Sequence, residues 1–149
     1  MAKRRVKIFM ATIIRDIEIG AGAKFVWSAV RDVGNVHVRL FPGFVTDVTM
    51  EPGIRHVKFA TGWVIHELIV SVDDELRRIA YASVQGRAQH HNSSMQVLTL
   101  SESRCRILWP TDVLPDSVAG SISDILNIAI PIMVRTLEAD ARKVGGGCD

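Results

Sequence analysis

The segment from Asp116 to Lys143 constrains the fold of this chain most strongly, because it has the pattern of one long amphipathic helix. Its apolar residues recur at steps of three and four, which places them along one side of a helix. About seven turns would span on the order of 40 Å. An apolar stripe of that length needs a surface to cover it, which the rest of the chain must supply. The stripe consists of Val118, Ile122, Ile125, Ala129 and Ile132, with Leu126, Met133 and Leu137 beside it.

The opposite side of this helix is polar, and Pro131 falls on that side. A proline inside a helix frees one carbonyl group and kinks the helix. On the solvent side, we expect it to bend the helix around whatever the helix covers. Asp116 is a candidate cap for the first turn.

The residues before this helix alternate between apolar and polar side chains, which predicts strands joined by short turns. In the turn Glu51-Pro52-Gly53, proline presets φ and glycine accepts a positive φ. One strand, two short helices, about six strands and a long helix indicate an α+β fold, with a helix on one face of an antiparallel sheet. A sheet of about seven strands curls, and a helix in its concave side leaves space between them. The expected strands are 11–19, 44–50, 54–60, 63–72, 78–84, 90–100 and 104–109, the short helices are 23–31 and 35–40, and 110–115 is a loop.

Size and charge indicate a single globular domain, since the chain has 149 residues, of which 48% are hydrophobic and 23% charged. We expect this domain at residues 11–144, between a basic tail at 1–10 and a flexible tail at 145–149. The formal charge is +2, but Lys3, Arg4, Arg5 and Lys7 contribute four positive charges, which leaves −2 on the rest. A solvated terminus explains these four better than a binding arm, and nothing indicates nucleic-acid binding.

The sequence predicts neither membrane insertion nor a signal peptide. No run of 18 or more apolar residues occurs, and the segment 6–14 is interrupted by Lys7 and Thr12. Cys105 lies in an expected strand and Cys148 in the glycine-rich C-terminal tail. Two unrelated thiols are typical of a reducing compartment, so we expect a cytoplasmic protein.

The central hairpin carries a family resemblance. Glu67-Leu68-Ile69, Asp73-Asp74-Glu75, Arg77-Arg78 and Tyr81 resemble the Bet v 1/START-like (SRPBCC) superfamily, in particular its polyketide cyclase/dehydrase and lipid-transport branch, which includes the plant abscisic-acid receptors. The segment Val26-Trp27 to Asp32, Gly86 to Asn92, Trp109 and the last helix follow the same order, so the resemblance covers nearly the whole chain from Ala11. It implies a helix-grip fold with an apolar ligand cavity between the sheet and the long helix. Ser93 replaces a tyrosine of the receptors, and the short link at 60–62 lacks their gate loop, so hormone-receptor gating is not expected.

The resemblance places Glu67 in the cavity, and strand alternation then predicts that Trp63, Ile65, Ile69 and Ser71 share its face. Aromatic and aliphatic walls with a few polar groups are typical of small-molecule pockets. The predicted ligand-binding residues are Trp27, Arg39, Phe41, Trp63, Ile65, Glu67, Ile69, Tyr81, His90, Ser93, Met95, Trp109, Ile125, Ala129, Ile132 and Met133.

Glu67 has three open interpretations: a polar anchor for the ligand, a partner of a nearby cation such as Arg39 or Arg87, or a catalytic acid or base. Among apolar neighbours its carboxylate would be desolvated and its pKa raised. Arg39 lies near the family position that offers a basic group to a ligand carboxylate, and a solvated arginine is the alternative.

Neither a metal nor a cofactor is expected. His90 and His91 are adjacent, so a strand sends their rings to opposite faces, and no third ligand has useful spacing. We place His90 in the pocket wall and His37, His56, His66 and His91 at the surface or at strand edges. No dinucleotide, phosphate-loop or Gly-x-Ser-x-Gly motif occurs.

These features lead to three hypotheses. The leading one is a carrier or sensor for a hydrophobic small molecule such as a lipid, polyketide, isoprenoid or aromatic. The second is a cyclase or dehydratase in which Glu67, Tyr81 or His90 transfers protons. The third is a protein-interaction module or homodimer formed through the outer sheet face, where Val64, Leu68, Val70 and Val72 are expected; β-propensity on a half-covered face is the simpler explanation. Ile128 is a further expected exposed apolar residue.

Overall fold

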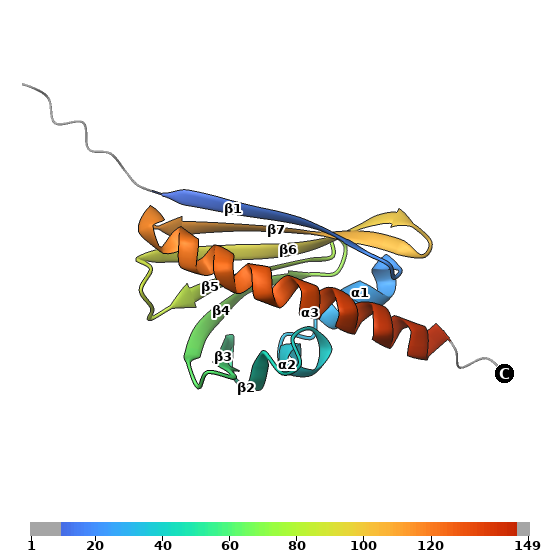
Figure 1. Ribbon diagram of the computed structural model, residues 1–149, viewed down its shortest axis with the longest axis horizontal. Helices are drawn as coiled ribbons and strands as arrows, with labels where there is room; N and C mark the ends of the chain where they lie inside the picture. The colour runs from blue at the N-terminus through green and yellow to red at the C-terminus, as the bar shows by residue number, and fades with distance from the viewer. Residues whose placement is uncertain (1–9, 146–149) are drawn as a thin grey trace, which may run out of the picture.

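The computed structural model describes residues 10–145, which form one antiparallel sheet, two short helices and one long helix (Figure 1). The tail residues Lys3, Arg4, Arg5, Lys7 and Cys148 lie outside the described residues. In chain order the elements are β1 (Ala11–Ile19), α1 (Ala23–Val30), α2 (Val36–Arg39), β2 (Val45–Glu51), β3 (Ile54–Phe59), β4 (Val64–Asp73), β5 (Arg78–Val84), β6 (His90–Ser101), β7 (Arg104–Leu114), the 3₁₀ turn η1 (Asp116–Val118) and α3 (Ala119–Gly145).

The seven strands form a sheet in the order β1-β7-β6-β5-β4-β3-β2, with every neighbouring pair antiparallel. From β2 to β7 each strand pairs with the next one in sequence, as expected of successive hairpins. β1 is different, because it pairs with β7, the last strand. Gly53 has a φ of 75° between β2 and β3, which confirms the reason given for glycine in that turn.

β7 is longer than the sequence predicts, because it continues through Pro110 to Leu114 instead of ending at Trp109. The predicted loop at 110–115 was therefore wrong. Thr111 and Val113 are buried and continue the alternation of Ile107 and Trp109. The free energy gained by burying these side chains outweighs the cost of the one sheet hydrogen bond that proline cannot donate.

A β-bulge between Ile69 and Ser71 changes the predicted faces of β4. Ser71 pairs with Ala80 and Val72 with the buried Ile79, so Ser71 lies on the outer face and Val72 on the inner one, the reverse of the expectation. Val64, Leu68 and Val70 are exposed, as predicted for the outer face. Association through this face remains a prediction.

α3 buries a stripe turned by about one residue from the predicted one. Its buried residues are Leu126, Ala129, Met133 and Leu137, whereas Ile122 and Ile125 are only partly buried. Pro131 and Ile128 are exposed, as expected. Asp116 makes no capping side-chain hydrogen bond at the start of η1, where Pro115 is the N-cap residue.

The two halves of α3 have different surroundings. The helix runs diagonally across the concave side of the curled sheet, and its C-terminal half passes beside α1 (Figure 1). Met133 and Leu137 join the core there with Val26 and Val30. The Gly20 amide donates to Glu138 Oε1 at 2.8 Å, which fixes this half to the end of β1.

The segment Asp116–Gly145 is the one described helix whose length and composition are compatible with a membrane span. Core helices of soluble proteins meet the same criteria, so this is weak support for insertion. Here the helix packs on the sheet.

Candidate functional site

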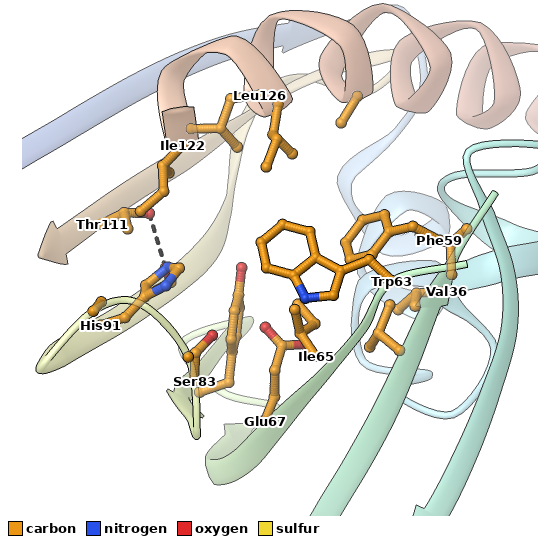
Figure 2. A pocket seen from close by; sticks show the side chains of 18 of the residues that line it. Val36, Phe59, Trp63, Ile65, Glu67, Ser83, His91, Thr111, Ile122 and Leu126 are labelled. Carbon is orange, nitrogen blue, oxygen red and sulfur yellow. Dashed lines mark hydrogen bonds between the residues drawn. The ribbon is translucent and has the colours of Figure 1, made fainter. Parts of the chain in front are cut away.

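A cavity of about 330 Å³ lies between the concave face of the sheet and the N-terminal half of α3 (Figure 2). Its floor is formed by inward residues of β3 to β7, and its roof by residues from Ser117 to Ala129. α2 and the segment that follows it close one end with Val36, Leu40, Phe41 and Phe44. The helix therefore covers the sheet without filling it, because Ile122 and Ile125 face open space.

Most of the wall is apolar, and a buried ion pair forms part of its floor. Arg55 and Glu67 are directly opposite each other on β3 and β4, and each is only 5% exposed. Arg55 Nε donates to Glu67 Oε1 at 2.8 Å, and Arg55 Nη1 donates to the Val33 carbonyl at 3.2 Å. The guanidinium also lies 4.9 Å from the centre of the Tyr81 ring. The pair compensates both charges, so Glu67 is a paired carboxylate, and its partner is neither Arg39 nor Arg87.

A second group of polar side chains crosses the floor on β5, β6 and β7. Tyr81, Ser93 and Thr111 are successive cross-strand partners. The Ser93 and Thr111 hydroxyls lie 2.8 Å apart, and Trp109 Nε1 donates to the Tyr81 hydroxyl at 3.0 Å. Burial raises the pKa of Tyr81 above its ordinary value, so this phenol stays protonated at neutral pH.

Ser83 supplies an unpartnered polar atom to the same floor. It lies directly opposite Glu67 on the neighbouring strand, and its labelled side chain lies beside Glu67 and His91 in Figure 2. Its Oγ atom is buried and has no hydrogen-bond partner among the described residues. A buried hydroxyl without a partner costs about 1–3 kcal/mol, so a hydrogen-bonding group placed there would be stabilised.

His91, not His90, lines the cavity. His91 shares its face of β6 with Ser93 and Met95, whereas His90 is exposed. The alternation that placed Ser93 inside therefore also places His91 inside. Burial lowers the pKa of His91, while the nearby Glu67 acts in the opposite direction. The neutral imidazole is the favoured form at pH 7.

This shift predicts a pH dependence of stability. A histidine whose pKa is lower when folded binds protons more readily when unfolded, so the free energy of unfolding should fall as the pH drops below about 6.5. His91→Gln should reduce this fall in the free energy of unfolding, measured by urea denaturation between pH 7.5 and pH 5. His90→Gln is the comparison variant and should change the pH dependence much less, because repulsion from His90 is the smallest of the causes that act on the pKa of His91. An equal fall in the free energy of unfolding in the wild type and in His91→Gln would contradict a lowered pKa for His91.

The cavity lining reaches the surface at Trp63 and at residues 85–87, which are exposed, and we take this as the mouth of the cavity. Trp63 is 49% exposed although it lines the cavity, and the Arg87 guanidinium lies 5.9 Å from the centre of its ring. A tryptophan that is half in the cavity wall and half in solvent marks the place where a ligand can enter.

Several predicted ligand-binding residues do line the cavity: Phe41, Trp63, Ile65, Glu67, Tyr81, Ser93, Met95, Trp109, Ile125 and Ala129. Trp27 does not, because it lies in the core and its Nε1 donates to Asp74 Oδ1 at 2.9 Å. Arg39 points toward α1, where it donates to the Ser28 carbonyl at 2.7 Å and lies 3.7 Å from Asp32.

Four further predicted residues lie outside the cavity wall. Ile69 packs against the core just before the bulge, and His90 is on the opposite face from His91. Met133 is buried in the core and Ile132 is half-buried, since both lie beyond the part of α3 that forms the roof.

Strand alternation from Tyr81 also places Ser83 inside, although it is not among the predicted ligand-binding residues. Sequence reasoning missed other lining residues, above all Arg55, His91, Thr111 and Leu126. Arg55 had a usable signal: a hairpin with its turn at 60–62 places residue 55 opposite residue 67. Thr111 was missed because the expected strand ends at Trp109, whereas β7 continues to Leu114. Within residues 10–145, no group of three or more His, Cys, Asp or Glu side chains is arranged to hold a metal ion.

A curled seven-stranded antiparallel sheet around a C-terminal helix, with an apolar cavity between them, is the helix-grip fold that the sequence resemblance implied. Solved structures with this fold include norcoclaurine synthase from Thalictrum flavum with a transition-state analogue bound (19% identity, 95% of this chain and 100% of that chain, TM-score 0.74). They also include the Zhui aromatase/cyclase from Streptomyces sp. R1128 (16% identity, 93% of this chain and 99% of that chain, TM-score 0.68). A third is an uncharacterized protein from Bacillus thuringiensis (14% identity, 85% of this chain and 98% of that chain, TM-score 0.77).

No protein-family model matches the chain, and no curated protein matches it. TM-scores of 0.68–0.77 establish a common fold although the identities are only 14–19%, and this supports the resemblance found in the central hairpin. They do not transfer an activity, because one fold supports many functions.

Proposed function

We propose that this protein binds a hydrophobic small molecule in the cavity beneath α3, as a carrier or sensor. The main observation is the cavity itself, whose largely apolar walls come from both the sheet and the helix. An apolar ligand that fills it removes surface from water on both partners, at roughly 25 cal/mol per Å². Lipids, polyketides, isoprenoids and aromatics are the candidate classes.

The comparisons are consistent with small-molecule binding. Norcoclaurine synthase from Thalictrum flavum has been solved in complex with dopamine and hydroxybenzaldehyde, and it has 18% identity and a TM-score of 0.64 with this chain. A related fold thus accommodates small organic molecules.

The contacts give less support to a proton-transferring enzyme. Of its three expected residues, Glu67 is held by Arg55, His90 is exposed, and the Tyr81 phenol has a raised pKa. Proton transfer is easiest for a group with a pKa near the working pH. His91 is the remaining titratable histidine in the wall.

The proposal predicts that protein purified under native conditions carries an apolar ligand, detected by native mass spectrometry and solvent extraction. Ile125→Trp should exclude that ligand, because Ile125 faces the cavity. Ile128→Trp is the matched control, since Ile128 is 56% exposed and lies outside the cavity wall. We expect ligand loss in the first variant only, with both variants folded by far-ultraviolet circular dichroism. Equal ligand content in both variants would contradict the proposal.

A further inference from the structure

The charged side chains of the cavity indicate which kind of ligand head group it accepts. Among the described residues, the charged groups in the wall are Arg55, Glu67 and Arg87. Arg55 and Glu67 neutralise each other at 2.8 Å and are both almost completely buried. A ligand carboxylate would have to compete with Glu67 for Arg55, and a ligand amine would have to compete with Arg55 for Glu67. Either exchange leaves one buried charge without its partner.

The other two arginines near the site do not provide a buried cation. Arg87 is exposed at the mouth, over the Trp63 ring. Arg39, which the family resemblance placed near a ligand carboxylate, bonds to Ser28 and lies close to Asp32. An ionic head group that entered the cavity would therefore lose water without gaining a free counter-charge.

The cavity wall does, in contrast, offer an uncharged hydrogen-bonding group that is not yet satisfied. The Ser83 hydroxyl is buried and has no partner within residues 10–145, and it lies next to the ion pair in the cross-strand row of Arg55, Glu67 and Ser83. A hydroxyl both donates and accepts, so a ligand hydroxyl or carbonyl oxygen satisfies it equally well. Tyr81 and the Ser93–Thr111 pair lie on the same floor and already have partners.

We propose that the cavity selects an uncharged, mostly apolar molecule with a hydroxyl or carbonyl oxygen that hydrogen-bonds Ser83. This inference rests on the proposed function and specifies its ligand class. It also predicts discrimination against ligands of the same shape that carry a carboxylate or an ammonium group.

A matched set of probes tests the proposal: 2-naphthol, 2-naphthoate and 2-naphthylmethylammonium, titrated calorimetrically into the full chain at pH 7. The three share one ring system and differ mainly in the charge of the head group. We expect the naphthol to bind about tenfold or more tightly than either ion, because the ions lose solvation without compensation. Equal or tighter binding of either ion would overturn the ligand class.

Ser83→Ala tests the polar contact, and Ser71→Ala on the outer face is the matched control. Loss of one hydrogen bond should weaken naphthol binding about fivefold to tenfold in Ser83→Ala, with no change in Ser71→Ala. Unchanged affinity in Ser83→Ala would overturn the role of Ser83. Absence of binding by all three probes would count against the cavity proposal itself, whereas binding without discrimination overturns only the uncharged class.

Discussion

Replacing Arg55 by methionine is expected to lower the free energy of unfolding by about 3–5 kcal/mol. The substitution removes the only described salt-bridge partner of Glu67, a carboxylate that is 5% exposed. It also removes the contact between the guanidinium and the Tyr81 ring. The measurement is urea denaturation at pH 7, followed by far-ultraviolet circular dichroism.

Two further variants separate the buried charge from loss of packing. The double variant Arg55→Met/Glu67→Leu should recover most of the stability, since buried ion pairs can often be replaced by apolar residues. Arg104→Met is the matched control, because the Arg104–Glu18 pair is exposed, and it should change stability by less than about 1 kcal/mol. A similar loss for Arg55→Met and Arg104→Met would show that burial of the pair has no special energetic role.

Leu137→Ala should destabilise the protein by about 2–5 kcal/mol, the range for truncation of a buried leucine. Leu137 is 1% exposed and lies in the half of α3 that packs on the core, whereas the cavity lies under the other half. We expect little change in naphthol affinity if the variant is measured well below its melting temperature.

Ile128→Ala is the control on the same helix, and it should change stability by no more than about 0.5 kcal/mol. Calorimetric melting of both variants provides the comparison. Equal losses of stability in the two variants would mean that burial of Leu137 does not anchor the C-terminal half of α3 in the core.

Most of the fold could be predicted because its signals are local. Alternation identified the seven strands, and Pro52-Gly53 correctly marked a turn with positive φ at Gly53. Two errors have non-local causes. Pro110 is retained in β7 by the burial of its neighbours, and the bulge beside Val70 reverses the faces of Ser71 and Val72. Neither the strand continuing through Pro110 nor the bulge is indicated by the residues around it.

The candidate site was less predictable, because it depends on pairs brought together by the sheet. Strand alternation applied from Ser93 would have selected His91 instead of His90, so that error was avoidable. The orientation of Arg39 toward Ser28 was not, since a four-residue helix turns it away from the cavity. The depth at which α3 lies on the sheet, which leaves the cavity open, is a property of the whole fold.

The pairing of β1 with β7 has a consequence for how the protein is made. Ala11 lies opposite Val113, so the ribosome synthesises nearly the entire sheet before β1 meets β7, its strand partner in the described sheet. Closing a loop of that size is entropically costly, and contacts this distant in sequence slow folding. Until then β1 has no partner strand, and the isoleucines that it later buries remain exposed. This is the stage at which binding by chaperones or aggregation would compete with folding.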